Sequence, residues 1–288
     1  MADHPRFGPA GVPPMFRFAQ ATLSDVPILL REEGLDAFEY EAVHWGKKPQ
    51  VKRVDAEQLG LKAKENDVWL SLHGSYFINL CGEKAIVEAS KRRLIACATA
   101  AEWMKGHVVV FHPGFYGGKS RGEAFKLCLE ALKEVVEDLQ SQGVTNVKVG
   151  PETMGRLYQL GSLDEILSLC EIVERTQLVI DWSHLHAREG GCLNTVDDFR
   201  RTVLKIENRL GTEAVRNMHC HFTKIEFTAQ GEKRHHALLE KRYGPDFRKL
   251  AKVIAEFRLR PVIISESPIL DLDAVRMRDI LQEEWDNS

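Results

Sequence analysis

The sequence has no long hydrophobic run. Its longest apolar segments, such as residues 108–111 and 262–264, have the length of a β-strand and fall far short of the ~20 residues that cross a bilayer. It also has little excess charge of either sign, because 39 Lys and Arg stand against 42 Asp and Glu, a net charge of −3. A membrane-spanning chain and an extended basic nucleic-acid tract are therefore not expected, whereas a local basic patch remains compatible with this charge.

Several common functional signatures are also missing. No G-x-G-x-x-G follows the first predicted strand and no G-x-x-x-x-G-K-[ST] occurs anywhere, which argues against a doubly wound nucleotide-binding fold. The six cysteines are scattered without a C-x-x-C pair, a usage typical of reduced, packed thiols. The first 20 residues contain four prolines and no continuous apolar segment, so we expect no signal peptide and a cytoplasmic protein.

What the chain does contain is a repeated alternation of short apolar runs and amphipathic stretches. We predict strands at residues 15–18, 37–41, 69–73, 108–112, 147–152, 178–181, 215–219 and 261–266. The predicted helices cover residues 23–33, 56–65, 84–104, 123–140, 163–175, 196–209, 247–257 and 272–284. This alternation implies parallel strands joined by crossovers, and eight such units in roughly 250 residues indicate an α/β fold, the (β/α)8 TIM barrel. We expect one domain over residues 1–288, beginning with an irregular leader at residues 1–14.

Side chains that bind metals stand at the ends of six predicted strands. They are His73, His112, Glu152, Asp181, His219 and Glu266. A lone histidine after an apolar run is more often a satisfied buried residue than a ligand. The carboxyl ends of all barrel strands converge at one mouth, however, and burying six such groups together without a cation would be very costly. The coincidence therefore predicts a metal site.

Additional histidines indicate more than one ion. His184 follows Asp181 by three residues, and His235 lies in a long polar segment, residues 220–246. The whole set exceeds the three or four protein ligands of one zinc, so we predict two or three Zn²⁺ ions, with Mn²⁺ as the main competitor. Ions about 3.5–4 Å apart activate water and stabilise a leaving oxygen, which suits a phosphodiester substrate. We expect Glu152 and Glu266 to be catalytic, with Glu152 able to bridge two ions.

Seven short stretches between residues 35 and 270 resemble the endonuclease IV family of abasic-site DNA repair enzymes. They are HGSYFINL (73–80), FHPG (111–114), ET-x-G (152–155), DWSH (181–184), MH (218–219), RHH (234–236) and ES (266–267). The segment FGPAG (7–11) is similar to the archaeal-type branch. The resemblance implies a xylose-isomerase-like TIM barrel with three zinc ions that cuts the DNA backbone 5′ to an abasic site.

The resemblance also implies a role for each ligand. His73, His112 and Glu152 would hold the first zinc, and Glu152 would bridge to a second zinc. The ligands of that second ion would be Asp181, His219 and Glu266. A third zinc would use His184 and His235, but the family has an aspartate where this chain has Lys233. Glu232 and His221 are the candidate substitutes for the missing ligand.

Three residues are expected to contact double-stranded DNA containing an abasic site. Tyr76 matches a tyrosine that family members insert near the lesion, although a packing role is equally compatible with its position. Lys47 and Lys48 lie in a basic segment, and Lys contacts to phosphates supply most nonspecific DNA affinity. Nothing in the sequence requires a partner chain, so we expect a monomer.

Two other functions remain open at this point. A sugar isomerase or epimerase on the same kind of barrel would need only one divalent metal, which Glu152, Asp181, His219 and Glu266 suffice to hold. A non-catalytic DNA-lesion or metal-binding protein is the second alternative, because Lys233 disturbs the third zinc site. The number of metal ions per chain distinguishes the nuclease from the epimerase.

Overall fold

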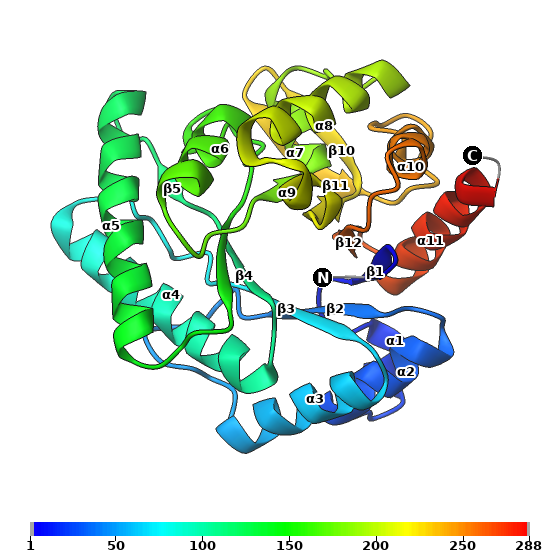
Figure 1. Cartoon of the computed structure of the whole chain (residues 1–288), viewed down its shortest axis with the longest axis horizontal. Coiled ribbons are helices and arrows are strands. Elements are labelled where there is room, and N and C mark those ends of the chain that lie inside the picture. The colour runs from blue at the N-terminus through cyan, green and yellow to red at the C-terminus, as the bar shows by residue number, and fades with distance from the viewer. Residues whose placement is uncertain (1–2, 287–288) are drawn as a thin grey trace.

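A closed ring of parallel strands with helices outside it forms the centre of the protein (Figure 1). This computed structural model describes residues 3–286. Two runs of four hydrogen-bonded strands make up the ring, β2-β3-β4-β6 and β8-β9-β12-β1, and bridges at Ala10–Glu39 and Glu152–Val179 join them. The strands are β1 (Arg6–Pro9), β2 (Ala37–Glu41), β3 (Trp69–His73), β4 (Val108–Phe111), β6 (Lys148–Pro151), β8 (Val179–Asp181), β9 (His219–Phe222) and β12 (Val262–Ser265). The predicted TIM barrel is confirmed.

The helices of the outer ring begin and end close to their predicted positions. They are α2 (Val26–Glu32), α3 (Arg53–Glu65), α4 (Lys84–Met104), α5 (Arg121–Ser141), α6 (Leu163–Ile172), α8 (Val196–Leu210), α10 (Phe247–Glu256) and α11 (Asp271–Asp286). Capping boxes at Ser120, Ser162 and Thr195 satisfy the first free N–H groups of α5, α6 and α8. Within residues 3–286, no helix combines the length and hydropathy that a bilayer crossing requires.

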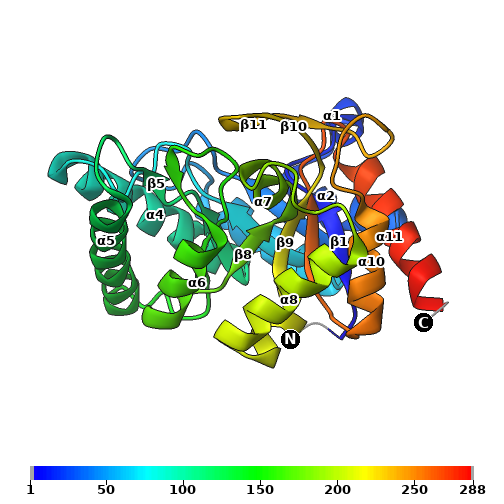
Figure 2. The ribbon, with the colours of Figure 1, turned by 90° about the horizontal axis from the view of Figure 1, so that it is seen from above.

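Smaller elements lie in the connections between the barrel strands and helices. They are α1 (Pro14–Phe18), a 3₁₀ turn at Leu23–Asp25, α7 (Trp182–Arg188), α9 (Thr212–Arg216) and two antiparallel pairs, β5 (Gly114–Phe115) with β7 (Gln159–Leu160) and β10 (Lys224–Thr228) with β11 (Gly231–His236). Figure 2 shows the β10–β11 hairpin along one edge of the molecule, while the N-terminal end of the chain lies at the opposite side. The hairpin is therefore placed over the end of the barrel where the strands finish.

The barrel interior changes from apolar to polar along the strands. Val109 and Phe111 of β4 point outward into the large core beneath the helices, whereas Val108, Val110 and Val179 pack together inside the ring. Nearer the carboxyl ends, buried glutamates and histidines replace these aliphatic side chains. Because alternate strand residues face the same side, a short strand can contribute one apolar and one polar layer to the interior.

The prediction for the beginning of the chain is wrong in two respects. The first barrel strand is β1, which lies inside the expected irregular leader, and residues 15–18 form most of α1 instead of a strand. Gly8 allows β1 to approach β2 closely, because a Cβ at this position would lie 1.7 Å from the Ala37 carbonyl oxygen. Pro14 at the first turn of α1 favours a helix start there. Of the leader, residues 1 and 2 lie outside the described part of the chain.

The strand predicted at residues 215–219 is also wrong. Residues 212–216 form α9, and the strand begins only at His219. The apolar residues Val215 and Met218 are buried, but they belong to the helical connection that packs beneath the barrel. This shift of about four residues changes which histidine reaches the mouth.

Candidate metal centre

Glu152 lies at the centre of a cluster of imidazoles at the carboxyl ends of the strands. Its Oε2 is 3.5 Å from His73 Nε2 and 3.1 Å from His112 Nε2, and its Oε1 is 3.3 Å from His184 Nδ1. The Glu152 side chain is fully buried. His73, His112 and Glu152 form one group whose potential ligand atoms all lie within 4.8 Å of one another. The barrel therefore brings together residues from three different strand ends.

A second group shares Glu152 with the first. It consists of Glu152, Asp181, His221 and Glu266. His221 Nδ1 lies 3.2 Å from Glu152 Oε1 and 3.1 Å from Glu266 Oε1. Asp181 uses Oδ1 to accept hydrogen bonds from the first backbone N–H groups of α7, which leaves Oδ2 directed toward the cluster. One carboxylate oxygen thus orients the side chain and the other is available to a ligand.

His221, not His219, is the β9 histidine of this group. Both residues point into the barrel because they are two positions apart on a strand. Since β9 begins at His219, that residue lies one layer deeper and contacts Glu39 instead of the mouth carboxylates. The assignment of His219 to the second metal is therefore corrected, and His221 takes the position that the sequence offered as a substitute ligand.

A third group lies on the hairpin side of the mouth. Asp181, His184, His235 and Glu266 form it, and His184 Nε2 is 3.3 Å from His235 Nε2. Glu232 adds a carboxylate, with Oε2 at 3.4 Å from His184 Nε2 and Oε1 at 3.9 Å from His235 Nε2. The neighbouring His236 faces away from the group and stacks on Tyr243.

A β-bulge explains how Glu232 reaches this position. In the β10–β11 pairing Arg234 lies opposite Glu226 and Glu232 lies opposite Phe227, so Lys233 is the extra residue. Lys233 points outward, with Nζ 2.6 Å from Glu226 Oε1. A bulge redirects side chains on its strand, and here it directs a carboxylate toward the histidines in place of the lysine.

Gly155 permits the close approach of the hairpin. The Glu232 N–H donates to the Gly155 carbonyl oxygen at 3.1 Å, and a Cβ on residue 155 would lie 2.6 Å from the Glu232 Cβ. A side chain at residue 155 would therefore push Glu232 away from His184. Steric crowding therefore explains why the ET-x-G stretch ends in a glycine.

The charges of the three groups fit divalent cations. Burial alone would raise the pKa of Glu152, but the surrounding imidazoles hold it well below its usual range. Burial opposes protonation of His73, yet its contact with Glu152 raises the pKa to about 10. Carboxylates also raise the pKa of His184 despite its burial. The cluster therefore needs positive charge, which a divalent metal would supply while displacing these protons.

Two orphaned oxygens support the same conclusion. Within residues 3–286, neither Glu152 Oε2 nor Asp181 Oδ2 receives a well-aligned hydrogen bond, although both atoms are buried. Imidazole nitrogens lie 3.1–3.5 Å from them. Buried carboxylate oxygens without donors are costly, and a metal ion satisfies them. The donor set of imidazoles and carboxylates suits Zn²⁺ and is compatible with Mn²⁺.

Two carboxylates near the centre, the fully buried Glu39 and the partly buried Glu41, were not predicted. Glu39 and Glu41 occupy alternate positions of β2 and therefore face the barrel interior together. Burial raises the pKa of Glu41 to about 7. The spacing of the two glutamates in F-E-Y-E is the sequence signal that both face the same side of β2. The same alternation is typical of an amphipathic surface strand, so it does not by itself indicate the barrel interior.

The rim of the mouth carries the residues predicted to contact DNA. A pocket of about 360 Å³ opens beside the third group, and its wall includes Tyr76, Phe115 and Arg156. Tyr76 is 48% exposed and its ring stacks on His112. Lys47 and Lys48 are exposed on the connection after β2, at the same end of the barrel. Their contact with DNA stays a prediction.

Comparisons of the sequence identify related proteins over nearly the whole chain. Residues 28–283 match a family model described as the xylose isomerase-like TIM barrel. An uncharacterised protein of Methanocaldococcus jannaschii is 34% identical over 278 residues, which cover 96% of this chain and 97% of that protein. A probable endonuclease 4 of Acholeplasma laidlawii is 24% identical over 282 residues, covering 85% of this chain and 89% of that protein.

Solved structures named after two different enzymes share the fold. Endonuclease IV from Thermus thermophilus superimposes with a TM-score of 0.70 at 20% identity, covering 91% of this chain and 94% of that chain. A D-tagatose 3-epimerase-like protein gives a TM-score of 0.68 at 18% identity, covering 92% and 94%. These similarities show the barrel and leave the choice of chemistry to the residues of the centre.

Proposed function

Because the chain belongs to the xylose isomerase-like TIM barrel family, we propose that it is a metal-dependent phosphodiesterase that cuts DNA on the 5′ side of abasic sites. One observation carries the proposal: His73 and His112 form a ligand group of their own with Glu152, next to the group of Glu152, Asp181, His221 and Glu266. Two ligand groups that share one carboxylate suit two neighbouring ions, the arrangement that favours phosphodiester cleavage.

Each part of the mouth has a role in this reaction. Divalent ions held by these two groups would supply activation of water and stabilisation of charge on the leaving oxygen. Glu152 would bridge the two ligand groups through its separate oxygens. Glu266 faces the pocket and stays ionised at neutral pH, because His221 lowers its pKa to about 2 against the effect of burial. It would help to hold an ion and would orient the attacking water.

The pocket wall offers a cation for an anionic substrate. The Arg156 side chain is 43% exposed, and Nη1 donates to the Tyr158 hydroxyl at 3.0 Å. The loop that carries it is held by the buried Arg188, which donates 2.7 Å to the Arg156 carbonyl oxygen. A guanidinium fixed at the mouth favours binding of a phosphate. The similarity to a probable endonuclease 4 supports the view that this phosphate belongs to DNA.

The test is a DNA duplex with one synthetic abasic site. We expect zinc- or manganese-dependent nicking on the 5′ side of the site, leaving a 3′-hydroxyl, and loss of nicking when a chelator is added. Glu152→Gln should lower the rate by at least about 100-fold, since a neutral amide is a poor bridging ligand. The surface variant Glu134→Gln on α5 serves as the control. A wild-type protein that leaves the abasic duplex uncut under all metal conditions would refute the proposal.

A sugar isomerase or epimerase is the second candidate. Glu152, Asp181, His221 and Glu266 alone suffice for one ion, and an epimerase-like protein shares the fold at nearly the same TM-score. That reaction does not require His73 and His112 as metal ligands. Elemental analysis separates the two candidates, because one tightly bound ion per chain favours the epimerase and two or more favour the phosphodiesterase.

A further inference from the structure

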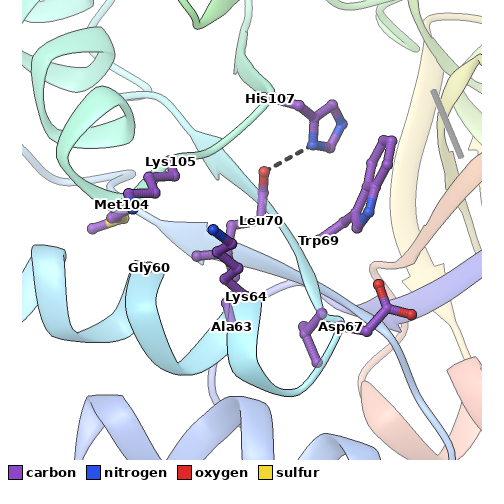
Figure 3. A pocket seen from close by; sticks show the side chains of 10 residues that line it. Gly60, Ala63, Lys64, Asp67, Trp69, Leu70, Met104, Lys105 and His107 are labelled. Atoms are coloured by element: carbon purple, nitrogen blue, oxygen red, sulfur yellow. Dashed lines mark hydrogen bonds between the residues drawn. The ribbon is translucent and has the colours of Figure 1, made fainter.

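The layer of the barrel below the metal centre contains a continuous chain of polar side chains. His221 Nε2 lies 2.9 Å from Glu39 Oε1, and Glu39 Oε2 lies 3.0 Å from His219 Nε2. His219 Nδ1 lies 3.1 Å from His107 Nε2, and His107 Nδ1 donates to the Leu70 carbonyl oxygen at 2.8 Å. Figure 3 shows this last contact beside a pocket at the other end of the barrel. The chain therefore crosses the barrel interior from His221 to β3.

This chain occupies space that barrels usually fill with aliphatic side chains. Glu39, His219 and His221 are fully buried, and Ser71 adds a further hydrogen bond to Glu39 Oε2 at 2.7 Å. Replacing a buried ionic network by apolar residues of similar volume is often neutral or stabilising. Stability alone therefore gives no reason for this arrangement, and a role in the function of the neighbouring centre does.

We propose that Glu39, His219 and His107 are positioning residues that fix the ring orientation and the tautomer of His221, so that its Nδ1 lone pair faces the metal site. This inference rests on the proposed metal centre. Nε2 of His221 lies 2.9 Å from the Glu39 carboxylate, while Nδ1 lies 3.2 Å from Glu152 and 3.1 Å from Glu266. A proton held on Nε2 by Glu39 would leave the Nδ1 lone pair free for the ion. A metal-ligating histidine commonly donates its other N–H to a carboxylate, which orients the ring and makes it a stronger ligand.

The row of polar side chains continues beyond Glu39 through two histidines. A neutral imidazole donates one hydrogen bond and accepts another, so His107 and His219 can each pass on a fixed orientation through their two ring nitrogens. His107 is anchored at the backbone and orients His219, and His219 in turn holds one oxygen of Glu39 so that the other faces His221.

Variants of Glu39 separate the two properties of this carboxylate. Glu39→Ala removes the charge and the contacts with His219, His221 and Ser71. Glu39→Gln keeps the shape, and its amide can donate to His219 and to the Ser71 hydroxyl oxygen while its own oxygen accepts from His221, so the charge is the main loss. Leu132→Ala on α5 removes buried apolar contacts far from the centre and is the control for a general loss of stability.

The experiment measures zinc affinity of the metal-free, full-length protein by competition with a chromophoric chelator. For Glu39→Ala we expect one zinc to bind about 10–100-fold more weakly. Glu39→Gln should restore most of that loss, and Leu132→Ala should bind like the wild type. Imidazole ¹⁵N spectra of the zinc-loaded protein should show His221 as the Nε2–H tautomer in the wild type and lose that signal in Glu39→Ala, a change that a purely structural role would not produce.

The outcomes distinguish this inference from the proposed function. If the wild type binds zinc and Glu39→Ala binds it equally well with an unchanged His221 tautomer, the positioning role is wrong and the metal centre stands. If Glu39→Gln is as impaired as Glu39→Ala, the charge and not the orientation of His221 matters, which also overturns the inference. A wild type that binds neither zinc nor manganese refutes the metal centre and, with it, the positioning role of Glu39, His219 and His107.

Discussion

At the scale of single residues, the two oxygens of Glu152 serve different neighbours. Oε2 faces His73 and His112, while Oε1 faces His184 and His221. A carboxylate surrounded on both sides by imidazoles can hold two cations without moving. This geometry makes Glu152 the residue whose charge connects the ligand groups.

Arg156 lines the pocket and belongs to none of the three ligand groups, and its Nε lies 3.9 Å from Glu232 Oε2. Arg156→Gln is expected to weaken binding of an abasic duplex by roughly tenfold through loss of one charge-assisted contact. It should also reduce the slope of log affinity against log salt concentration by about 1, the value for one phosphate contact. Fluorescence anisotropy over a range of salt concentrations measures both quantities.

The matched control for this change is Lys126→Gln on α5, where the side chain is 77% exposed and does not line the pocket. It should leave the salt slope unchanged. An Arg156→Gln variant whose slope equals that of the wild type would mean that the guanidinium contacts no phosphate.

Three of the residues that the sequence identified stand at the end of a clear apolar run. His73, His112 and Glu152 could be predicted in this way, because a buried apolar strand shows where its mouth end lies. His221 was placed second to His219, since M-H-C-H offers two histidines of the same parity and only the strand start decides their depth. No sequence pattern indicated Arg156, because the path of the β6–β7 connection alone brings it to the pocket.

At the scale of secondary-structure elements, the bulge in β11 decides which side chain joins the third ligand group. Glu232→Gln is expected to reduce the zinc content by one ion per chain, because the amide is a poor ligand for the site of His184 and His235. Lys233→Gln should leave the zinc content unchanged, since that side chain is 57% exposed and pairs with Glu226. Elemental analysis after dialysis gives both values. Equal losses in the two variants would contradict this account of the bulge.

Helix α7 carries a second histidine whose environment predicts a dependence of stability on pH. His186 is buried, its Nδ1 accepts a hydrogen bond from the Leu193 N–H at 3.0 Å, and its ring lies edge-on to Phe227. Burial lowers its pKa to about 4. The unfolded chain therefore binds a proton near pH 6.5 that the folded protein does not, and stability falls as the pH drops from about 6.5 to about 4.

The variant His186→Asn lacks this proton linkage. The stability difference between the wild type and the variant is expected to shrink by about 2–3 kcal/mol between about pH 7.5 and pH 4.5. Urea denaturation of the metal-free proteins at a series of pH values measures the difference. Parallel stability curves would show that His186 is protonated equally in the folded and unfolded states.

The two strands that the sequence analysis placed wrongly were missed for similar physical reasons. β1 has only four residues and includes a glycine and a proline, so its composition resembles a loop, and its strand character comes from pairing with β12. The segment before β9 has two buried apolar residues, Val215 and Met218, and so short a pattern fits a strand and a helix equally well. Tertiary contacts decide such short elements.

At the scale of the whole molecule, the barrel places a dense set of ionisable groups in one buried volume. Burial raises the pKa of Asp181 to about 6, while Glu152 and Glu266 stay ionised beside it. Without cations, these carboxylates repel one another and are compensated only by protonated imidazoles. Folding of the metal-free chain therefore carries an electrostatic cost that bound ions remove.

Metal binding is accordingly expected to raise the thermal stability of the whole barrel. An ion present at about 100 times its Kd contributes about 2.7 kcal/mol per site, so two sites contribute about 5 kcal/mol. At roughly 2 °C per kcal/mol for a protein of this size, zinc should raise the Tm by about 10 °C relative to the chelated protein in calorimetry. Glu152→Gln should show only a small part of this increase, because it weakens both ligand groups, whereas Glu134→Gln on α5 should show all of it. A wild-type Tm that is the same with zinc and with chelator would mean that the buried imidazoles and carboxylates hold no ion.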